Sequence, residues 1–233
     1  MAMSTLRLYA KELRLAYNAG QRDFRYWDLA QADLRGLRIP GANFFGADLC
    51  EADLRDSDLT GADLRATDMR RAQLSGAVLV GAQLSDAQLA EANLSNADLA
   101  DANLEGAWLV GANLEDANLE GAIMVESDLQ QARLEDADLA GANLSGASLY
   151  GADLAGADLQ EVDLTGADLT CADLEQADLR DATLVSAALR QADLRCADFG
   201  GANLTGVELY GANLHDADLA GTRPPRRKQP MRW

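Results

Sequence analysis

The sequence predicts an all-β fold, a coiled β-solenoid, on the strength of three observations. A large apolar residue, here called the central residue, occupies every fifth position from Phe24 to Leu219, 40 times without a slip, and it is Leu in 34 cases. Ala stands two residues before it in 32 repeats, and 18 of the 20 Gly stand two residues after it. Residues two apart lie on the same face of an extended chain, so Ala and the central residue face inward. The Gly position then marks a corner.

An α-helix does not fit this pattern. A step of five residues turns about 140° on a helix, which would spread the central residues around its whole circumference. Regularly spaced Gly would also cost about 1 kcal/mol each in a helix interior. Short extended segments that are broken by a corner every five residues satisfy both observations.

Residues 1–21 precede the repeats and are predicted to form a capping helix over the first coil, because an open coil exposes core and unpaired backbone. The helix is expected over residues 4–19, with Ser4 as its N-cap and Gly20 as its stop. Its apolar stripe contains Leu6, Tyr9, Leu13, Ala16 and Tyr17. In the first coil, bulky residues replace the usual small one and suit a plug beneath the helix: Arg22, Trp27 and Leu37.

The repeat A-D-L-x-x, as in Ala152-Asp153-Leu154, resembles the signature of the pentapeptide-repeat family, and the resemblance covers residues 22–221. It implies a right-handed quadrilateral β-helix with four repeats per coil, and therefore about ten coils and a rod of roughly 48 Å. The run from Tyr17 to Leu34 is similar to the opening of many cyanobacterial members. Members that protect DNA gyrase from quinolones sometimes carry loops that interrupt the repeats, and this array has none.

Residues 222–233 form a basic, Pro-rich tail that we expect to be disordered. The tail contains three Pro and five basic residues, so it cannot form an amphipathic helix. It either folds back on the rod or anchors an acidic partner or nucleic acid. Gyrase-protecting relatives dimerise through an apolar C-terminal segment, which this tail does not resemble, so we expect a monomer or a weak homodimer.

The net charge of −18 is unevenly distributed. Residues 23–222 carry −26, whereas the segments before and after them carry +3 and +5. Along the rod this is about 0.5 negative charge per Å, close to the roughly 0.6 per Å of duplex DNA. Such a rod is not expected to bind nucleic acid directly. It could imitate DNA, or the carboxylates could simply keep a Leu-filled rod soluble.

The four faces of the rod differ in charge, because residues 20 apart stack on one another. The adjacent faces that begin at Leu34 and Ile39 sum to −8 and −9, against −3 and −5 for the other two. We call the candidate partner-binding residues that concentrate there the acidic edge: Glu115, Asp116, Glu135, Asp136, Asp153, Asp158, Glu161, Asp173, Glu175, Asp178 and Asp181. A basic partner would be steered to it.

The two less acidic faces carry unusual apolar residues at outward positions around the fifth to seventh coils. We call these residues the apolar patch: Trp108, Val110, Ile123, Val125 and Tyr150. A clustered exposed patch marks an interaction site more often than scattered residues do. The alternative is drift of the repeat without a function.

No catalytic, cofactor-binding or metal site is predicted. His215 is the only histidine, and the three Cys (Cys50, Cys171 and Cys196) neither pair with it nor have zinc spacing. Stacked carboxylates such as Asp153, Asp173 and Asp193 are expected to repel one another and raise some pKa values. No apolar run approaches the roughly 18 residues of a membrane span, and no secretory signal is visible, so we expect a cytoplasmic protein that does not engage membranes.

The predicted function is that of a non-enzymatic protein-interaction scaffold or regulator that uses the acidic rod surface. The expected partner is another protein, in particular a basic or DNA-binding one. Two alternatives remain: a DNA mimic that modulates a type II topoisomerase by protecting or inhibiting gyrase, which the family resemblance suggests, and a purely structural spacer.

Overall fold

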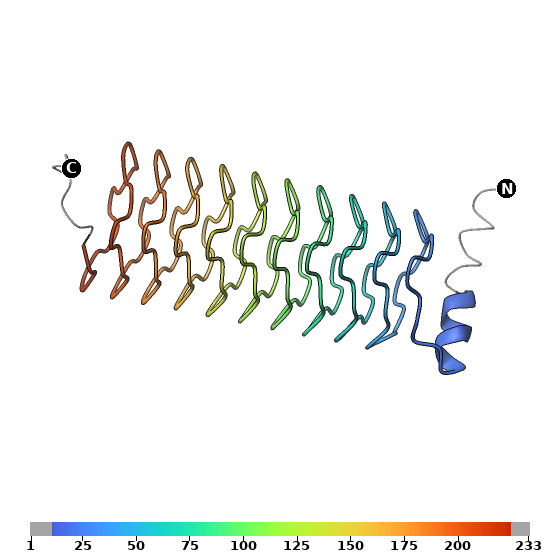
Figure 1. Ribbon diagram of the computed structural model, residues 1–233. Coiled ribbons are helices and arrows are strands. Elements are labelled where there is room, and N and C mark those ends of the chain that lie inside the picture. The colour runs from blue at the N-terminus through green and yellow to red at the C-terminus, as the bar shows by residue number, and fades with distance from the viewer. Residues whose placement is uncertain (1–10, 225–233) are drawn as a thin grey trace.

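The computed structural model describes residues 11–224, in which a short α-helix is followed by a right-handed quadrilateral β-helix (Figure 1). Isolated parallel β-bridges join residues 20 positions apart, so four repeats make one coil. On the first face these bridges run from Asp23↔Asn43 to Asn203↔Arg223 in ten successive steps. The predicted solenoid, with four repeats per coil, is therefore confirmed.

Three backbone hydrogen bonds per repeat join neighbouring coils, and one of them runs from the N–H of the corner residue to the carbonyl 19 residues later, as from Gly111 to Gln130 at 2.9 Å. The N–H of each central residue donates to the carbonyl 19 residues later, as Leu114 does to Arg133 at 2.7 Å. The N–H of the residue just before it donates to the carbonyl 21 residues earlier, as Asn113 does to Ala92 at 2.9 Å. Each coil is therefore paired in both directions, and only the two ends of the rod leave backbone groups without a neighbouring coil.

The corners impose a left-handed backbone conformation on whatever residue stands there. Corner φ angles lie between 55° and 79°, at Gly and also at 22 non-Gly residues such as Asp116 (55°). The positive φ costs roughly 1–2 kcal/mol for most side chains, and less for Asp and Asn, which bond locally. The Gly pattern thus marks the corners correctly, although the geometry does not depend on Gly.

The interior consists almost entirely of stacked Leu and Ala side chains, which are buried along the rod. Phe199 is buried near the far end of the rod, and the other interior aromatic rings lie in the first coils, where Phe24 stacks on Phe44 with ring centroids 5.4 Å apart. Trp27 meets Phe24 edge-on at 5.1 Å and packs against the core. The bulky residue at position 27 therefore fills the first coil, as predicted.

The single N-terminal helix, described over residues 11–18, lies across the first coil (Figure 1). Leu13 is fully buried, and the Tyr17 hydroxyl donates to the Pro40 carbonyl at 2.8 Å. The helix ends at Gly20 (φ 98°), where the Gln21 N–H donates to the Ala16 carbonyl. The predicted stop is confirmed, whereas Ser4, Leu6 and Tyr9 lie outside the described residues, as does the tail from residue 225. Within the described range, no helix has the length and apolarity of a membrane span.

Candidate interaction surface

The outward Asp or Asn before each central residue has a structural role of its own. Its side-chain oxygen accepts the backbone N–H of the residue two positions later, as Asp173 does from Glu175 at 2.9 Å and Asp158 from Gln160 at 3.0 Å. Asn113 makes the same bond to the N–H of Glu115. This local turn explains why the repeat prefers Asp and Asn, which supply the acceptor with or without a charge.

Some of these Asp residues are neutralised by an Arg two residues later. The guanidinium of Arg55, for example, donates to both oxygens of Asp53, at 2.8 and 2.6 Å. The same Asp-x-Arg arrangement recurs in Asp23–Arg25, Asp33–Arg35, Asp63–Arg65, Asp68–Arg70, Asp178–Arg180 and Asp193–Arg195. Their positions are confined to the first three coils and the last three.

The middle of the rod contains almost no basic residue to balance its carboxylates. Residues 72–179, here called the acidic belt, contain 21 Asp and Glu but only one basic residue, Arg133. Residues 22–71 and 180–223 each carry a net charge of only −2. The charge is therefore segregated along the axis of the rod, in addition to its bias between faces.

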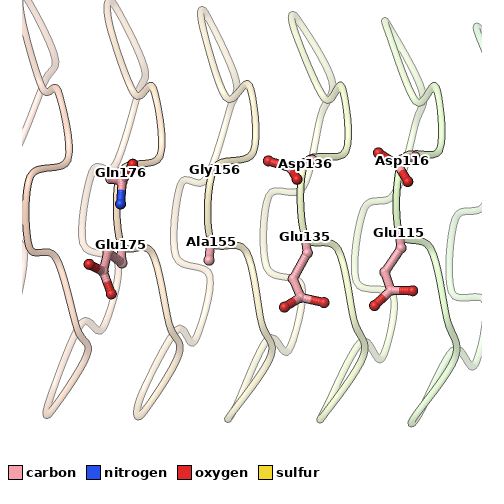
Figure 2. A pocket seen from close by; sticks show the side chains of 8 residues that line it. All are labelled: Glu115, Asp116, Glu135, Asp136, Ala155, Gly156, Glu175 and Gln176. Carbon is pink, nitrogen blue, oxygen red and sulfur yellow. The ribbon is translucent and has the colours of Figure 1, made fainter.

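Part of the acidic edge lines a surface depression within this belt. Figure 2 shows Glu115, Glu135 and Glu175 in a row along the rod, with a gap at Ala155 and Gly156, whose side chains are too small to fill it. The complete lining is Glu115, Asp116, Glu135, Asp136, Ala155, Gly156, Glu175 and Gln176. The remaining residues of the acidic edge do not line this depression: Asp153, Asp158, Glu161, Asp173, Asp178 and Asp181.

Ion pairs with Arg reduce the charge of the acidic edge at four of its members: Glu115, Glu135, Glu175 and Asp178. Arg133 pairs with both Glu115 and Glu135. Arg195 reaches Glu175 on the previous coil at 2.5 Å, and Asp178 is held by Arg180. The pairs Arg133–Glu115 and Arg195–Glu175 join residues 18 and 20 apart on neighbouring coils. Glu135 and Asp178 each pair with an Arg two residues away in the same repeat.

The expectation of raised pKa values in the ladder of Asp153, Asp173 and Asp193 is wrong at Asp193. The side chain of Arg195 donates to this carboxylate at 2.8 and 2.9 Å, and the hydrogen bond lowers its pKa. A bonded guanidinium outweighs the repulsion of stacked carboxylates, because it stabilises the charged form directly.

The apolar patch lies at the surface of the acidic belt, as its outward positions predict. Trp108 is 63% exposed, Tyr150 45% and Ile123 42%, whereas Val110 and Val125 are half-buried. Bridges place Trp108 beside Gln88 and Asp128, and Ile123 beside Asn103 and Asn143. In each of these two columns, an apolar side chain thus stands between polar side chains on the coils before and after it.

Two exposed aromatic residues outside this patch were missed from the sequence. Tyr26 occupies a corner with φ 61° and meets Phe45 edge-on, with ring centroids 5.8 Å apart. Tyr210 follows its central residue near the other end and is 81% exposed. A bulky side chain at a corner, where most repeats have Gly or a polar residue, was the available signal for Tyr26.

The reactive side chains do not assemble into a site. Cys50, Cys171 and Cys196 are free thiols, and burial raises the pKa of Cys50. His215 contacts only its neighbour Asp216 at 2.9 Å among charged groups of the described chain. Residues 11–224 contain no group of three His, Cys, Asp or Glu that could hold a metal ion.

The Asp-x-Arg pairs should make the rod less stable in acid. Hydrogen bonds from Arg lower the pKa of Asp53 and Asp63 below the ordinary 3.8, and that of Asp23 to about 2. Their stabilisation is present above the ordinary value of 3.8 and is lost as pH falls below it, for Asp23 down to about pH 2. We expect the melting temperature of the unmodified protein to fall more steeply over this window than that of an Arg55→Gln, Arg65→Gln variant. Equal slopes in circular dichroism melts would contradict this account.

Comparisons with known proteins agree with the geometry. A family model described as pentapeptide repeats matches repeatedly between residues 28 and 221. HetL from the cyanobacterium Nostoc sp. strain PCC 7120, described as involved in heterocyst differentiation regulation, is a similar solved structure. It is 37% identical, with a TM-score of 0.62, and the match covers 91% of this chain and 95% of HetL.

Two further solved structures are similar at lower TM-scores. Rfr23 from the cyanobacterium Cyanothece 51142 is 40% identical over 39% of this chain and 60% of its own, with a TM-score of 0.38. QnrB1, a plasmid-mediated fluoroquinolone resistance protein, is 22% identical over 86% of this chain and 90% of its own, with a TM-score of 0.44. Neither likeness carries an argument about function. No curated protein matches the sequence.

Proposed function

Because this chain belongs to the pentapeptide-repeat family, we propose that it is a non-enzymatic, cytoplasmic scaffold or regulator that binds another protein through its rod surface. The observation that carries the proposal is the acidic belt, whose 21 carboxylates share one Arg within the segment, while Arg71, Arg180 and Arg195 outside it pair with only three of them. Solubility alone does not require this segregation of charge. Asn makes the local turn as well as Asp does, so the turn does not require a carboxylate. The end coils also pair several of their Asp residues with Arg, as in Asp53–Arg55.

The similarity to HetL supports a regulatory role. HetL is described as involved in the regulation of heterocyst differentiation, and its similarity extends over nearly the whole of both chains. The partner of the present protein is proposed from chemistry instead: a protein with a basic surface, steered by the belt and anchored by an apolar contact. Trp108 is the natural anchor, because exposed aromatic residues dominate binding energy when a partner covers them.

The test separates charge from structure. An Asp153→Asn, Asp158→Asn, Asp173→Asn variant removes three belt charges and retains the side-chain oxygen that each turn requires. The matched control, Asp28→Asn, Asp48→Asn, Asp58→Asn, removes three charges from the end coils in the same way. Quantitative affinity capture from native cells should show proteins that bind the unmodified rod and the control but are depleted on the order of tenfold from the belt variant.

Trp108→Asp supplies an independent variant, since Asp is the usual residue at this position. We expect it to deplete the same proteins while the rod remains folded. If the belt variant, the control and Trp108→Asp capture the same proteins as the unmodified chain, the protein acts as a structural spacer and the proposal is wrong.

A DNA mimic that modulates a type II topoisomerase is the second candidate. The net −20 of residues 72–179 extends over about 26 Å, or one charge per roughly 1.3 Å, against one per about 1.7 Å in duplex DNA. A gyrase supercoiling assay tests this candidate. Micromolar rod should inhibit supercoiling or relieve quinolone inhibition, and the belt variant should lose the effect that the end-coil control retains. No effect of the unmodified rod would rule out gyrase as its target.

A further inference from the structure

The exposed aromatic side chains of the rod gather on one of its four faces. Among residues 22–224, five large apolar side chains are exposed: Tyr26, Trp108, Ile123, Tyr150 and Tyr210. Trp108, Tyr150 and Tyr210 all belong to the face that begins at Leu29, here called the aromatic face. Neither of the two most acidic faces carries any of the five. The rod is therefore aromatic on one side and acidic on the opposite side.

The three aromatic residues stand in register along the rod. The β-bridges of this face form one column: Trp108, Asp128, Ser148, Asp168, Ala188 and Glu208. Tyr150 and Tyr210 stand two residues after Ser148 and Glu208, so they point outward from the same face. With coils about 4.8 Å apart, Tyr150 lies two coils or about 10 Å beyond Trp108, and Tyr210 three coils or about 14 Å further.

Two free carboxylates alternate with the aromatic residues along this face. Asp128 and Asp168 stand two coils, or about 10 Å, apart. Each accepts the backbone N–H of the residue two positions later, at 3.2 Å for Asp128 and 3.0 Å for Asp168. Neither makes an ion pair with any residue in the range 11–224, whereas Glu208 pairs with Arg190. The face therefore offers two negative charges between Trp108 and Tyr210.

We propose, as a refinement that rests on the proposed function, that the aromatic face binds a basic amphipathic α-helix of the partner protein, which lies along the rod axis. The partner cannot pair here as a β-strand, because the N–H groups of this face already bond to neighbouring coils, as Trp108 does to the Ala87 carbonyl at 2.9 Å. It must recognise side chains instead. The two outward columns of the face stand about 7 Å apart, which suits a helix about 10–12 Å across.

The spacing along the rod also matches a helix. The distance from Trp108 to Tyr210 is about 24 Å, which corresponds to about 16 residues of helix at 1.5 Å each. The apolar stripe of such a helix would cover Trp108 and the two tyrosines. Lys or Arg side chains about seven residues apart lie on one side of a helix and would reach Asp128 and Asp168.

A second copy of the chain fits this face less well than a basic helix does. Face-to-face pairing of two rods would bring the Asp128 and Asp168 carboxylates of both copies together. Each rod also carries the acidic belt, with a net charge of −20, so the two copies would repel one another. A basic helix gains from the same charges.

Site-specific photo-cross-linking in extracts of native cells tests this inference. Benzoylphenylalanine takes the place of Tyr150 in one variant, of Tyr210 in a second and, as a control on the opposite face, of Ala140 in a third. We expect the first two to cross-link one protein at positions about ten residues apart in a single amphipathic segment rich in Lys and Arg. A distance of 14 Å corresponds to about ten residues of helix but only about four of an extended chain. The control should not cross-link this segment.

Substitutions in the chain that carries the photoreactive residue at position 210 examine the individual contacts. Tyr150→Thr introduces the residue type that the next coil has at Thr170, and should lower the yield of cross-linked partner on the order of tenfold. Asp128→Asn with Asp168→Asn keeps the oxygen that each turn requires, and should lower both the yield and its sensitivity to salt.

The matched control for the two carboxylates is Asp98→Asn with Asp138→Asn. These residues also stand two coils apart in the acidic belt and make the same local turn, but they lie on the opposite face. Their substitution should leave the yield unchanged. Equal losses in the two double variants would show that the partner responds only to the total charge of the belt, and would contradict the proposed contacts.

Three further results would overturn the proposal. Cross-links from positions 150 and 210 that map to different proteins, or about four residues apart, would exclude a single helix. Cross-links to another rod would assign the face to a second copy. Cross-links only from position 140 would exclude the aromatic face but leave the proposed function intact, whereas no cross-link from any of the three positions would contradict both.

Discussion

Leu119→Ala should lower the free energy of unfolding by about 3 kcal/mol, because it removes a fully buried side chain from a close-packed column. Stacked coils above and below hold the neighbouring Leu in place, so the cavity cannot collapse easily. Leu219→Ala is the matched control. Leu219 stands in the same column five coils later, where it is only partly buried, and its truncation should cost less than half as much.

Urea denaturation followed by circular dichroism measures both variants. Unfolding of a solenoid can proceed from its ends, so exchange at the Leu114 amide should accompany the melts to show that the middle of the rod is affected. Similar losses in Leu119→Ala and Leu219→Ala would show that the last coil is as tightly packed as the middle one, contrary to the burial described here.

The second large effect is expected from proline placed at a central position in the middle of the rod. Met124→Pro removes the N–H that donates to the Asn143 carbonyl at 2.7 Å, and should cost about 3 kcal/mol or more. Val125→Pro, one residue later, removes an N–H that makes no hydrogen bond within the described chain, and its carbonyl still accepts from Gly106. Its cost should be within about 1 kcal/mol.

Thermal melts of this pair show at which position of the repeat the rod tolerates proline. Pro40 already stands directly after a central residue, as proline would in Val125→Pro. The Pro40 carbonyl accepts a hydrogen bond from the Tyr17 hydroxyl. If Val125→Pro is as damaging as Met124→Pro, then proline is excluded after a central residue in general.

The sequence predicted the fold closely because one short period carries the whole architecture. Leu and Ala two residues apart identify the inward face in every repeat, and the corner follows two residues after the centre. The N-terminal stop at Gly20 and the packing of Leu13 and Tyr17 followed from ordinary helix signals. The outward positions of Trp108 and Ile123 required only the same period.

The surface was less predictable, because charges interact across coils as well as along the chain. The net charge of −26 along the rod, and its division among the four faces, do not show the acidic belt. The scarcity of Arg in residues 72–179 is nevertheless visible in the sequence. The pairing of Arg133 with Glu115 depends on the stacking of neighbouring coils. The lowered pKa of Asp193 depends on a guanidinium that the repeat places over it.

The sequence by itself therefore determined the solenoid, its inward faces and its total charge, since a periodic chain has only one way to bury Leu every five residues. The tertiary structure decided what this periodicity left open. It showed that the corners adopt positive φ without Gly, and that Ala155 and Gly156 leave a depression in a row of Glu side chains. These features arise between residues about 20 apart, whose contacts exist only once the coils have stacked.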